Sequence, residues 1–250
     1  MYIVGGYTSD DLMSDLICDN YSMLLILNRF GISLGFGDDT IDEVCSKYKI
    51  DTCTFLAIVN LYLLEDNSSY TLDATNISLS SLLGYLHNSH SYFLDYKFKS
   101  IREKLVASLN DLNNPVAKAI IRYYDEYVNE IRIHMLYEEN VVFPYSSTFI
   151  SSNLNDKLDL KKNENESCND NKFNIEVFSM SHENIDIKLD ELKNIIIKYY
   201  SSEATNELSS VLFDIFTCEQ DLASHNNIED FILVPTIKTL EESKYNGNGK

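Results

Sequence analysis

Histidine and glutamate recur at one spacing in two places in this chain. The first copy is HMLYEENVVFP, which begins at His134, and the second is HNNIEDFILVP, which begins at His225. In both copies a glutamate, Glu138 or Glu229, follows the histidine by four residues, and a proline comes six residues later. Positions i and i+4 of a helix share a face, so each pair can offer one imidazole and one carboxylate to a metal ion. The proline has a simpler explanation, because proline can end a helix there.

The other three histidines strengthen the case for a metal site. His182 lies in SMSHENIDIKLDEL, and His87 and His90 lie in GYLHNSHSYFLDY. Each expected pair of helices then has a lone histidine position on its first helix and His-x-x-x-Glu on its second. If the second pair folds onto the first, four histidines and both glutamates converge. His87 and His90 are three residues apart, so both could face inward, and spacing leaves the choice between them open.

This set of ligands predicts two metal ions. Each ion would take two imidazoles, and Glu138 and Glu229 would bridge the ions with one oxygen each. The second copy of the motif favours Glu138 over its neighbour Glu139. Two places remain on an octahedral ion, one for a shared oxo or hydroxo bridge and one for a small ligand. Nitrogen and oxygen ligands without thiolate favour iron over manganese or zinc. A surface ion pair is the alternative for each motif taken alone.

Four long helices must position these residues, and we expect an all-α fold. Few glycines and prolines interrupt the apolar periodicity, which is helical. We expect a small N-terminal helical domain, then a linker and a four-helix bundle that contains a long mobile loop. The domain is 1–65, the linker 66–77, the bundle 78–245 and the loop 151–172; the bundle helices are expected at about 78–109, 115–146, 173–199 and 203–242.

Composition excludes several functions. The 250 residues carry a formal net charge of −19, which argues against binding to nucleic acid or to anionic membranes. There is no apolar run of membrane-spanning length and no signal peptide, so we expect a cytoplasmic protein. The five cysteines form no CxxC motif, which favours buried reduced thiols over disulfides or a zinc site. The sequence has neither a phosphate-binding glycine loop nor a G-x-S-x-G motif, so nothing in it supports a hydrolase.

The motifs resemble those of one known family, described as repair of iron centres, in the hemerythrin-like superfamily. IRIHMLYEENVVFP resembles its H-x-x-x-E-E-x-x-x-F-P segment, and SMSHENID resembles the segment with its lone third-helix histidine. DLASHNNIEDFILVP resembles its H-x-x-x-E-N segment, with Asp230 where asparagine is usual. YLHNSH resembles an H-x-x-H segment whose first histidine is the ligand, which favours His87. NRFGISLGFGDDTIDEVCSKYKID resembles the small N-terminal domain, so the resemblance covers most of the chain.

The resemblance implies a cytoplasmic non-haem di-iron protein with an oxo- or hydroxo-bridged centre. Such a protein would help to repair iron–sulfur clusters damaged by nitrosative or oxidative stress. The implied terminal ligands are His87, His134, His182 and His225. The implied bridging ligands are Glu138 and Glu229. The family often carries adjacent cysteines before its N-terminal glycine turn. Gly35 and Phe36 occupy that place here, so no role that needs those thiols is implied.

Two other functions remain open from the sequence. A hemerythrin-like carrier or sensor of dioxygen or nitric oxide would use the same ligands. A helical bundle in which metal only stabilises the fold, or which holds no metal, is the third possibility. The expected partners are a small ligand such as nitric oxide or dioxygen, and iron–sulfur proteins. The sequence leaves open whether the protein is an enzyme, which residues would be catalytic, and whether it is a monomer or a dimer.

Overall fold

The computed structural model is helical, which confirms the predicted all-α fold. The structure describes residues 6–64, 71–109, 114–155, 175, 183–200 and 205–247. In this part of the chain, β-type pairing is limited to one isolated antiparallel bridge between Leu12 and Thr40. None of the described helices has the length and hydropathy that a membrane crossing requires. The chain forms two compact units, which are described separately below.

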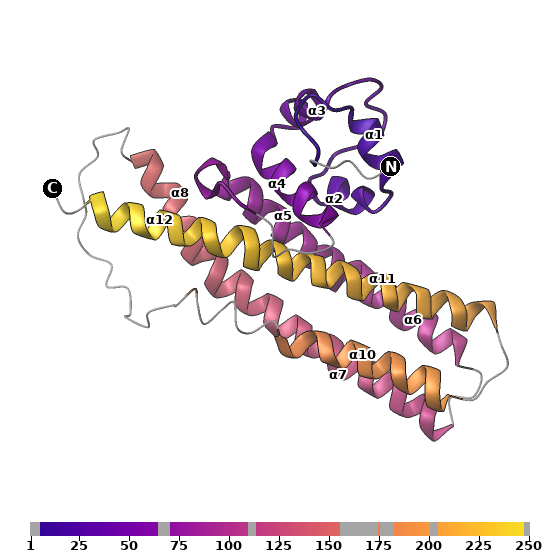
Figure 1. The fold of residues 1–250 in the computed structure, drawn as a ribbon. Helices are drawn as coiled ribbons and strands as arrows, with labels where there is room; N and C mark the ends of the chain where they lie inside the picture. Colours follow the sequence, from indigo (N-terminus) through magenta and orange to yellow (C-terminus); the bar gives the residue numbers. More distant parts are fainter. Residues whose placement is uncertain are drawn as a thin grey trace. The chain divides into compact units, whose positions relative to one another are not determined.

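Unit 1 consists of Met1–Asn88, Glu139–Ser179 and Asn227–Lys250. It begins with four short helices, α1 (Met13–Asp19), α2 (Met23–Arg29), α3 (Ile41–Tyr48) and α4 (Thr52–Leu63), shown in indigo and purple in Figure 1. Side chains cap two of them. Thr40 and Glu43 form a capping box at the start of α3, and Asp51 Oδ1 accepts a hydrogen bond from the Thr54 amide at 2.8 Å.

The remaining helices of unit 1 come from three distant parts of the sequence. They are the 3-10 turn η2 (Ala74–Asn76), α5 (Leu79–Ser91), α8 (Phe143–Asn155) and α12 (Val234–Gly247). Two π-helical segments, η4 (Glu138–Val142) and η5 (Glu229–Leu233), accompany them. The unit includes α5 only as far as Asn88 and η4 only from Glu139. One apolar core joins them to the N-terminal helices, and fully buried Phe55, Leu82 and Ile232 belong to it. The N-terminal helices therefore share a core with helices of the expected bundle.

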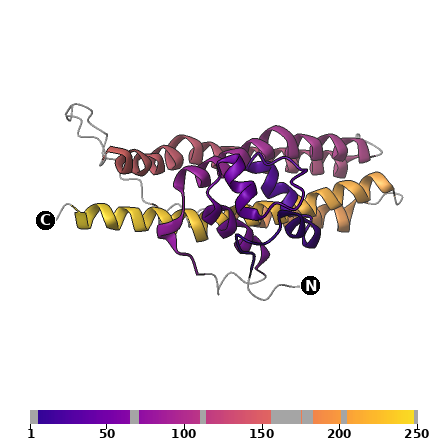
Figure 2. The same ribbon diagram turned by 90° about the horizontal axis from the view of Figure 1, so that it is seen from above.

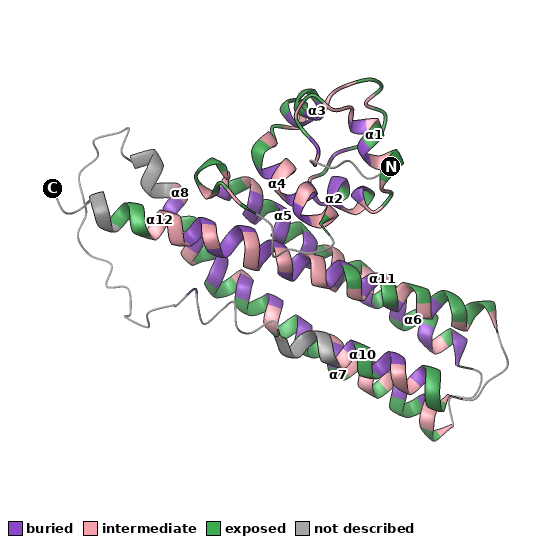
Figure 3. Cartoon of the chain, viewed as in Figure 1, coloured by how far each residue is buried: buried purple, intermediate pink, exposed green. Residues whose placement is uncertain are grey.

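Unit 2 consists of Ser89–Glu138 and Met180–Asn226 and is a bundle of four helices. They are α6 (Phe98–Ser108), preceded by the π-helical segment η3 (Tyr92–Lys97), α7 (Pro115–Tyr137), α10 (Glu183–Tyr199) and α11 (Asn206–Ile228) as far as Asn226. Helix α7 packs against both α6 and α10. Figure 1 shows α7 beside α10, and Figure 2 shows the same ribbon from above. Buried residues from all four helices form one core, and those of α6 and α10 are visible in purple in Figure 3.

Polar contacts fix the helices of unit 2 against one another. The buried Tyr124 hydroxyl donates a hydrogen bond to the Phe98 carbonyl at 2.8 Å, which ties α7 to α6. Lys97 and Lys104 both pair with Asp214 of α11, at 3.0 and 2.5 Å. Partial burial raises the pKa of Asp214, but the hydrogen bonds from the two lysines outweigh this effect and lower it overall. Asp214 therefore stays ionised and holds α11 beside α6.

The expected helix spans agree with the structure in most places. The first of the four expected bundle helices ends at Ser108, one residue before its expected end at 109. The second and fourth extend to Asn155 and Gly247, beyond their expected ends at 146 and 242. The expected third helix, 173–199, is described from Glu183 onward and at Ile175; the rest of it lies outside the described residues. Most of the expected loop 151–172 also lies outside them. The domain boundaries 1–65, 66–77 and 78–245 stay a prediction.

The cysteines only partly match the expectation of buried thiols. Cys45 and Cys218 are buried and in no disulfide, whereas Cys18 and Cys53 are exposed, so the prediction was wrong for these two. Cys18 and Cys53 face solvent because the apolar stripes of their short helices occupy other faces. Cys168 lies outside the described residues.

Cys45 should resist alkylation even though thiols are generally reactive. Burial raises the pKa of its thiol to about 12, and the negative charge of Asp42 adds to the increase. At pH 8 a pKa near 12 leaves roughly a thousandfold less thiolate than an ordinary cysteine has. We expect iodoacetamide to label Cys18 and Cys53 readily and Cys45 very slowly, as measured by mass spectrometry of peptides. Equal labelling of Cys45 and Cys53 in folded protein would contradict this expectation.

Candidate metal centre

The buried face of α7 leads directly to the first His-x-x-x-Glu pair. Buried side chains recur every three or four residues along this face and reach Ile131 and Met135. Glu138 follows Met135 by three residues, so it continues the same face, and it is fully buried. His134 keeps 15% of its side chain exposed, and its Nε2 lies 2.8 Å from Glu138 Oε1. The apolar periodicity of the helix thus brings both residues of the motif inward.

The second pair is positioned by the same kind of stripe on α11. Cys218 and Leu222 are buried members of the unit 2 core, and His225 follows Leu222 by three residues. His225 is 2% exposed, and Glu229, one turn later on the same uninterrupted helical run, is fully buried. The helix itself therefore brings Glu229 to the side of His225.

The lone histidine on α5 that points inward is His90. It follows buried Leu82 and Leu86 at four-residue intervals, and Phe93 continues the stripe three residues later. His90 is 2% exposed. His87 lies on another face of the helix, with 61% of its side chain exposed, and its Nδ1 is 3.0 Å from a carboxylate oxygen of Glu139. The preference for His87 is thus not supported, because the packing of α5 buries the face that carries His90.

Four buried residues converge on one point: His90, Glu138, His225 and Glu229. One ligand atom from each lies within 4.8 Å of the other three, in a search limited to the described residues. The Nε2 atoms of His90 and His225 are 3.2 Å apart, and His90 Nε2 lies 3.1 Å from Glu138 Oε2. The fully buried Phe93 ring packs edge-on against His225, with ring centroids 5.9 Å apart, and forms an apolar wall beside the cluster.

These separations fit a metal ion. Two ligand atoms each about 2.1 Å from an ion and about 90° apart lie about 3.0 Å from one another. The His90–His225 and His90–Glu138 separations are close to this value. Imidazole and carboxylate ligands together suit a divalent or trivalent transition metal. The arrangement can also offset the cost of burying two carboxylates, because a cation supplies the compensating charge.

Both carboxylates stand at the first residue of a π-helical segment. Glu138 begins η4 and Glu229 begins η5, and η3 follows His90 by two residues. A π-helical turn accommodates one extra residue and changes the direction of the side chains around it, and such turns are frequent at functional sites. This irregularity has no clear signature in the sequence. It coincides with the ligands on three separate helical runs.

The π-helical segments also account for the two prolines. The explanation that Pro144 and Pro235 end their helices was wrong, because α8 and α12 continue past them. In η5 the Val234 amide bonds to the Glu229 carbonyl, five residues earlier. The wider turn gives room to the proline ring, which would otherwise clash with a carbonyl of the preceding turn. The prolines therefore mark the ends of the widened turns, and the helices run on.

The sequence-predicted ligands can now be located. The structure brings Glu138, His225 and Glu229 into the cluster, and it places His134 against Glu138. Glu139, which the repeat did not favour, keeps 26% of its side chain exposed and pairs with His87. His182 lies outside the described residues. The residue that motif comparison did not favour is His90. Apolar residues at 82, 86 and 93 share its face, but Leu79 and Leu83 precede His87 at the same four-residue spacing, so the sequence signal did not separate the two.

Exchanging the two histidines of α5 for alanine, one at a time, tests this assignment. We expect His90→Ala to lower the metal bound per chain to about half or less, because it removes a buried ligand. His87→Ala should leave the metal content unchanged and serves as the matched control three residues away. Metal in purified protein is measured by mass spectrometry, and circular dichroism checks that both variants fold. Loss of metal in His87→Ala alone would contradict the assignment.

Comparison with protein families agrees with the geometry. Residues 82–237, well over half of the chain, match the family described as the hemerythrin HHE cation binding domain. This span includes all four residues of the cluster and His134. A comparison with curated proteins found no match to the chain. On the extent of the family match, this chain belongs to the hemerythrin HHE cation-binding domain family, and it is a metal-binding protein with a hemerythrin-like helical bundle.

Proposed function

We propose that this chain holds two iron ions bridged by Glu138 and Glu229. The proposal is carried by one observation, which is that the two oxygens of Glu138 face different imidazoles. Oε2 lies 3.1 Å from His90 Nε2, and Oε1 lies 2.8 Å from His134 Nε2. A carboxylate that bridges two ions binds a different ion through each of its two oxygens. Each of those ions would have its own imidazole ligand, so an imidazole is expected near each oxygen. A single ion would require only one of these two contacts.

The neighbours of Glu138 suggest how the ligands divide between the ions. His90 and His225 would bind the first ion, because their Nε2 atoms are 3.2 Å apart. His134 would bind the second, with His182 as the additional imidazole that the sequence motif supplies. Glu229 would provide the second bridge from its buried position one turn after His225. Each ion would then have two imidazoles and two carboxylate oxygens from the protein.

The surroundings of the ligands support iron in a site with little water. The cluster offers nitrogen and oxygen atoms, which suit iron, and the resemblance of the motifs to iron-binding segments favours iron over zinc or manganese. When bound, the two ions would supply one-electron redox chemistry and an open position for a small ligand such as nitric oxide or dioxygen. The protein would orient the imidazoles, and Phe93 would exclude water from the side of His225.

The finer role that we propose is the repair of iron–sulfur clusters damaged by nitrosative or oxidative stress, in the cytoplasm. Its support is the resemblance of the four ligand segments and of the N-terminal region to the repair-of-iron-centres family. The partners would be iron–sulfur proteins. The paired cysteines of that family are absent here, and Cys45 is buried with its pKa raised to about 12. The role would therefore rely on the metal centre without an N-terminal thiolate from Cys45.

Iron content tests the two-ion centre. Protein purified from iron-replete cells should contain about two iron ions per chain, as di-iron helical bundles do. Glu138→Gln should lose most of this iron, because an amide cannot replace a bridging carboxylate. Glu139→Gln is the matched control, and it should keep its iron. Iron analysis with the visible absorption spectrum measures both, and full iron in Glu138→Gln would overturn the bridge.

Recovery of a damaged enzyme tests the repair role. An enzyme with a [4Fe–4S] cluster is inactivated by nitric oxide and then incubated with iron-loaded wild type, His87→Ala or His90→Ala. We expect wild type and His87→Ala to restore its activity and His90→Ala to fail, because only the last lacks a ligand of the centre. If no protein restores activity, and wild type changes its spectrum reversibly with dioxygen without losing iron, the carrier or sensor function replaces repair.

A further inference from the structure

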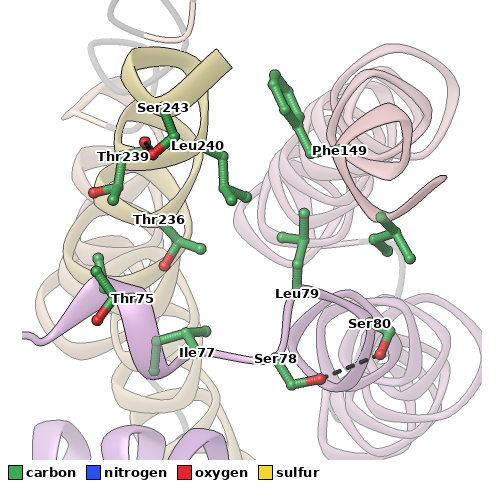
Figure 4. Close-up of a pocket in the computed structure, with 12 residues that line it drawn as sticks. Thr75, Ile77, Ser78, Leu79, Ser80, Phe149, Thr236, Thr239, Leu240 and Ser243 are labelled. Atoms are coloured by element: carbon green, nitrogen blue, oxygen red, sulfur yellow. Dashed lines mark hydrogen bonds between the residues drawn. The ribbon is translucent and has the colours of Figure 1, made fainter. Parts of the chain in front are cut away.

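Among the described residues of unit 1, two pockets differ in charge. The larger has a volume of about 610 Å³ and lies between the start of α5, α8 and α12. Its walls include Leu79, Phe149 and Leu240, with hydroxyl groups between them (Figure 4). The Thr236 and Thr239 hydroxyls donate to carbonyls of their own helix. No charged side chain is present among the described residues that line this pocket.

The smaller pocket, of about 280 Å³, is positively charged. It lies between α2, the α3–α4 turn and α5, and it is lined by Arg29, Lys49, Ser80, Ser81, Tyr85 and Asn88, among others. The described residues that line it include these two cations and no carboxylate. The whole chain has 39 acidic and 20 basic residues, so this local excess of positive charge runs against its composition.

Arg29 forms the buried part of this pocket and is held in place. It is only 2% exposed, and its Nη1 donates to the Tyr85 hydroxyl at 3.3 Å. Its guanidinium carbon lies 5.9 Å from the centre of the Tyr85 ring, and the Asn88 amide donates to the Arg29 carbonyl at 2.7 Å. A guanidinium is planar and can bind two oxygens of one anion, so a fixed arginine lowers the cost of ordering on binding.

The other groups around the pocket add to its positive potential. Ser81 lies in the first turn of α5, where the helix dipole favours negative charge; its hydroxyl accepts a hydrogen bond from the Asp51 amide at 3.5 Å and can donate its own hydrogen. The Ser80 hydroxyl lies 3.2 Å from that of Ser78, beside the larger pocket (Figure 4). Lys49 ends α3 in the left-handed conformation, with φ 59°. The nearest acid along the chain, Asp51, accepts hydrogen bonds from the amide and hydroxyl of Thr54 at the start of α4. Its charge is thus engaged in capping α4.

We propose that this pocket is a binding site for a small oxyanion, a phosphate or carboxylate group. Two cations, the Ser81 hydroxyl and a helix start supply the charge and the donors that such an anion needs. The volume limits the ligand to a small molecule or to the anionic end of a larger one. Phosphate should bind more tightly than a monocarboxylate, because it carries more negative charge near neutral pH. This inference is independent of the proposed iron chemistry.

Calorimetric titration of the full-length, iron-loaded protein tests the site. Inorganic phosphate and acetate are titrated separately at one ionic strength, which is set with sodium chloride. Lys49→Asn removes the charge, and asparagine tolerates the left-handed conformation. We expect it to weaken phosphate binding by about tenfold, and Lys49→Asp to abolish it. Lys47→Asn is the matched control on the same helix, outside the pocket, and it should bind like wild type.

The outcomes separate this site from the metal centre and from diffuse attraction. The net charge of −19 disfavours general attraction of anions, so saturable binding requires a local site. Binding that survives Lys49→Asp unchanged would place the anion elsewhere, for example at iron, and would overturn the proposal. So would equal loss in Lys47→Asn, or the absence of saturable binding to both anions. Acetate binding as tight as that of phosphate would support the site and identify carboxylates as its ligands.

Discussion

Two fully buried carboxylates, Glu138 and Glu229, have oxygens within 4.8 Å of each other and of two buried imidazoles. Removing charged groups from water costs several kcal/mol for each ion, and two like charges at short range add repulsion. Positive charge in the same place offsets both effects while the carboxylates stay ionised. Metal ions provide it more effectively than protonated imidazoles, because they also satisfy the remaining lone pairs. The helices of this protein are arranged around that requirement.

The helices meet the requirement by extending their apolar stripes into the cluster. On α7 and α11 the residues that build the core recur every three or four positions, and the ligands come next in the same series. Packing of the core therefore also fixes the directions of the ligands. The π-helical segments at Glu138 and Glu229 then turn each carboxylate relative to the stripe before it. Three such segments lie at or next to the ligands, each on a separate helical run.

The N-terminal helices contribute something different from the metal centre. They share an apolar core with parts of α5, α8 and α12, and the positively charged pocket forms between them and α5. Gly35 and Phe36 occupy the place where the repair-of-iron-centres family, which the sequence resembles, often carries paired cysteines. Cys45 cannot take their place, since it is buried and its thiol is protonated at neutral pH. In this chain the pocket beside the N-terminal helices offers cationic groups from Arg29 and Lys49.

The sequence by itself determined the helical fold and three residues of the cluster. The repeated His-x-x-x-Glu motif selected Glu138 over Glu139 because a helix places i and i+4 on one face, a local property that needs no tertiary information. The choice between His87 and His90 was different. Each follows a leucine by four residues, and only the packing of α5 against other helices decided which face is buried. The π-helical turns and the passage of two helices through proline also depend on tertiary structure, because a strained turn persists only where surrounding contacts stabilise it.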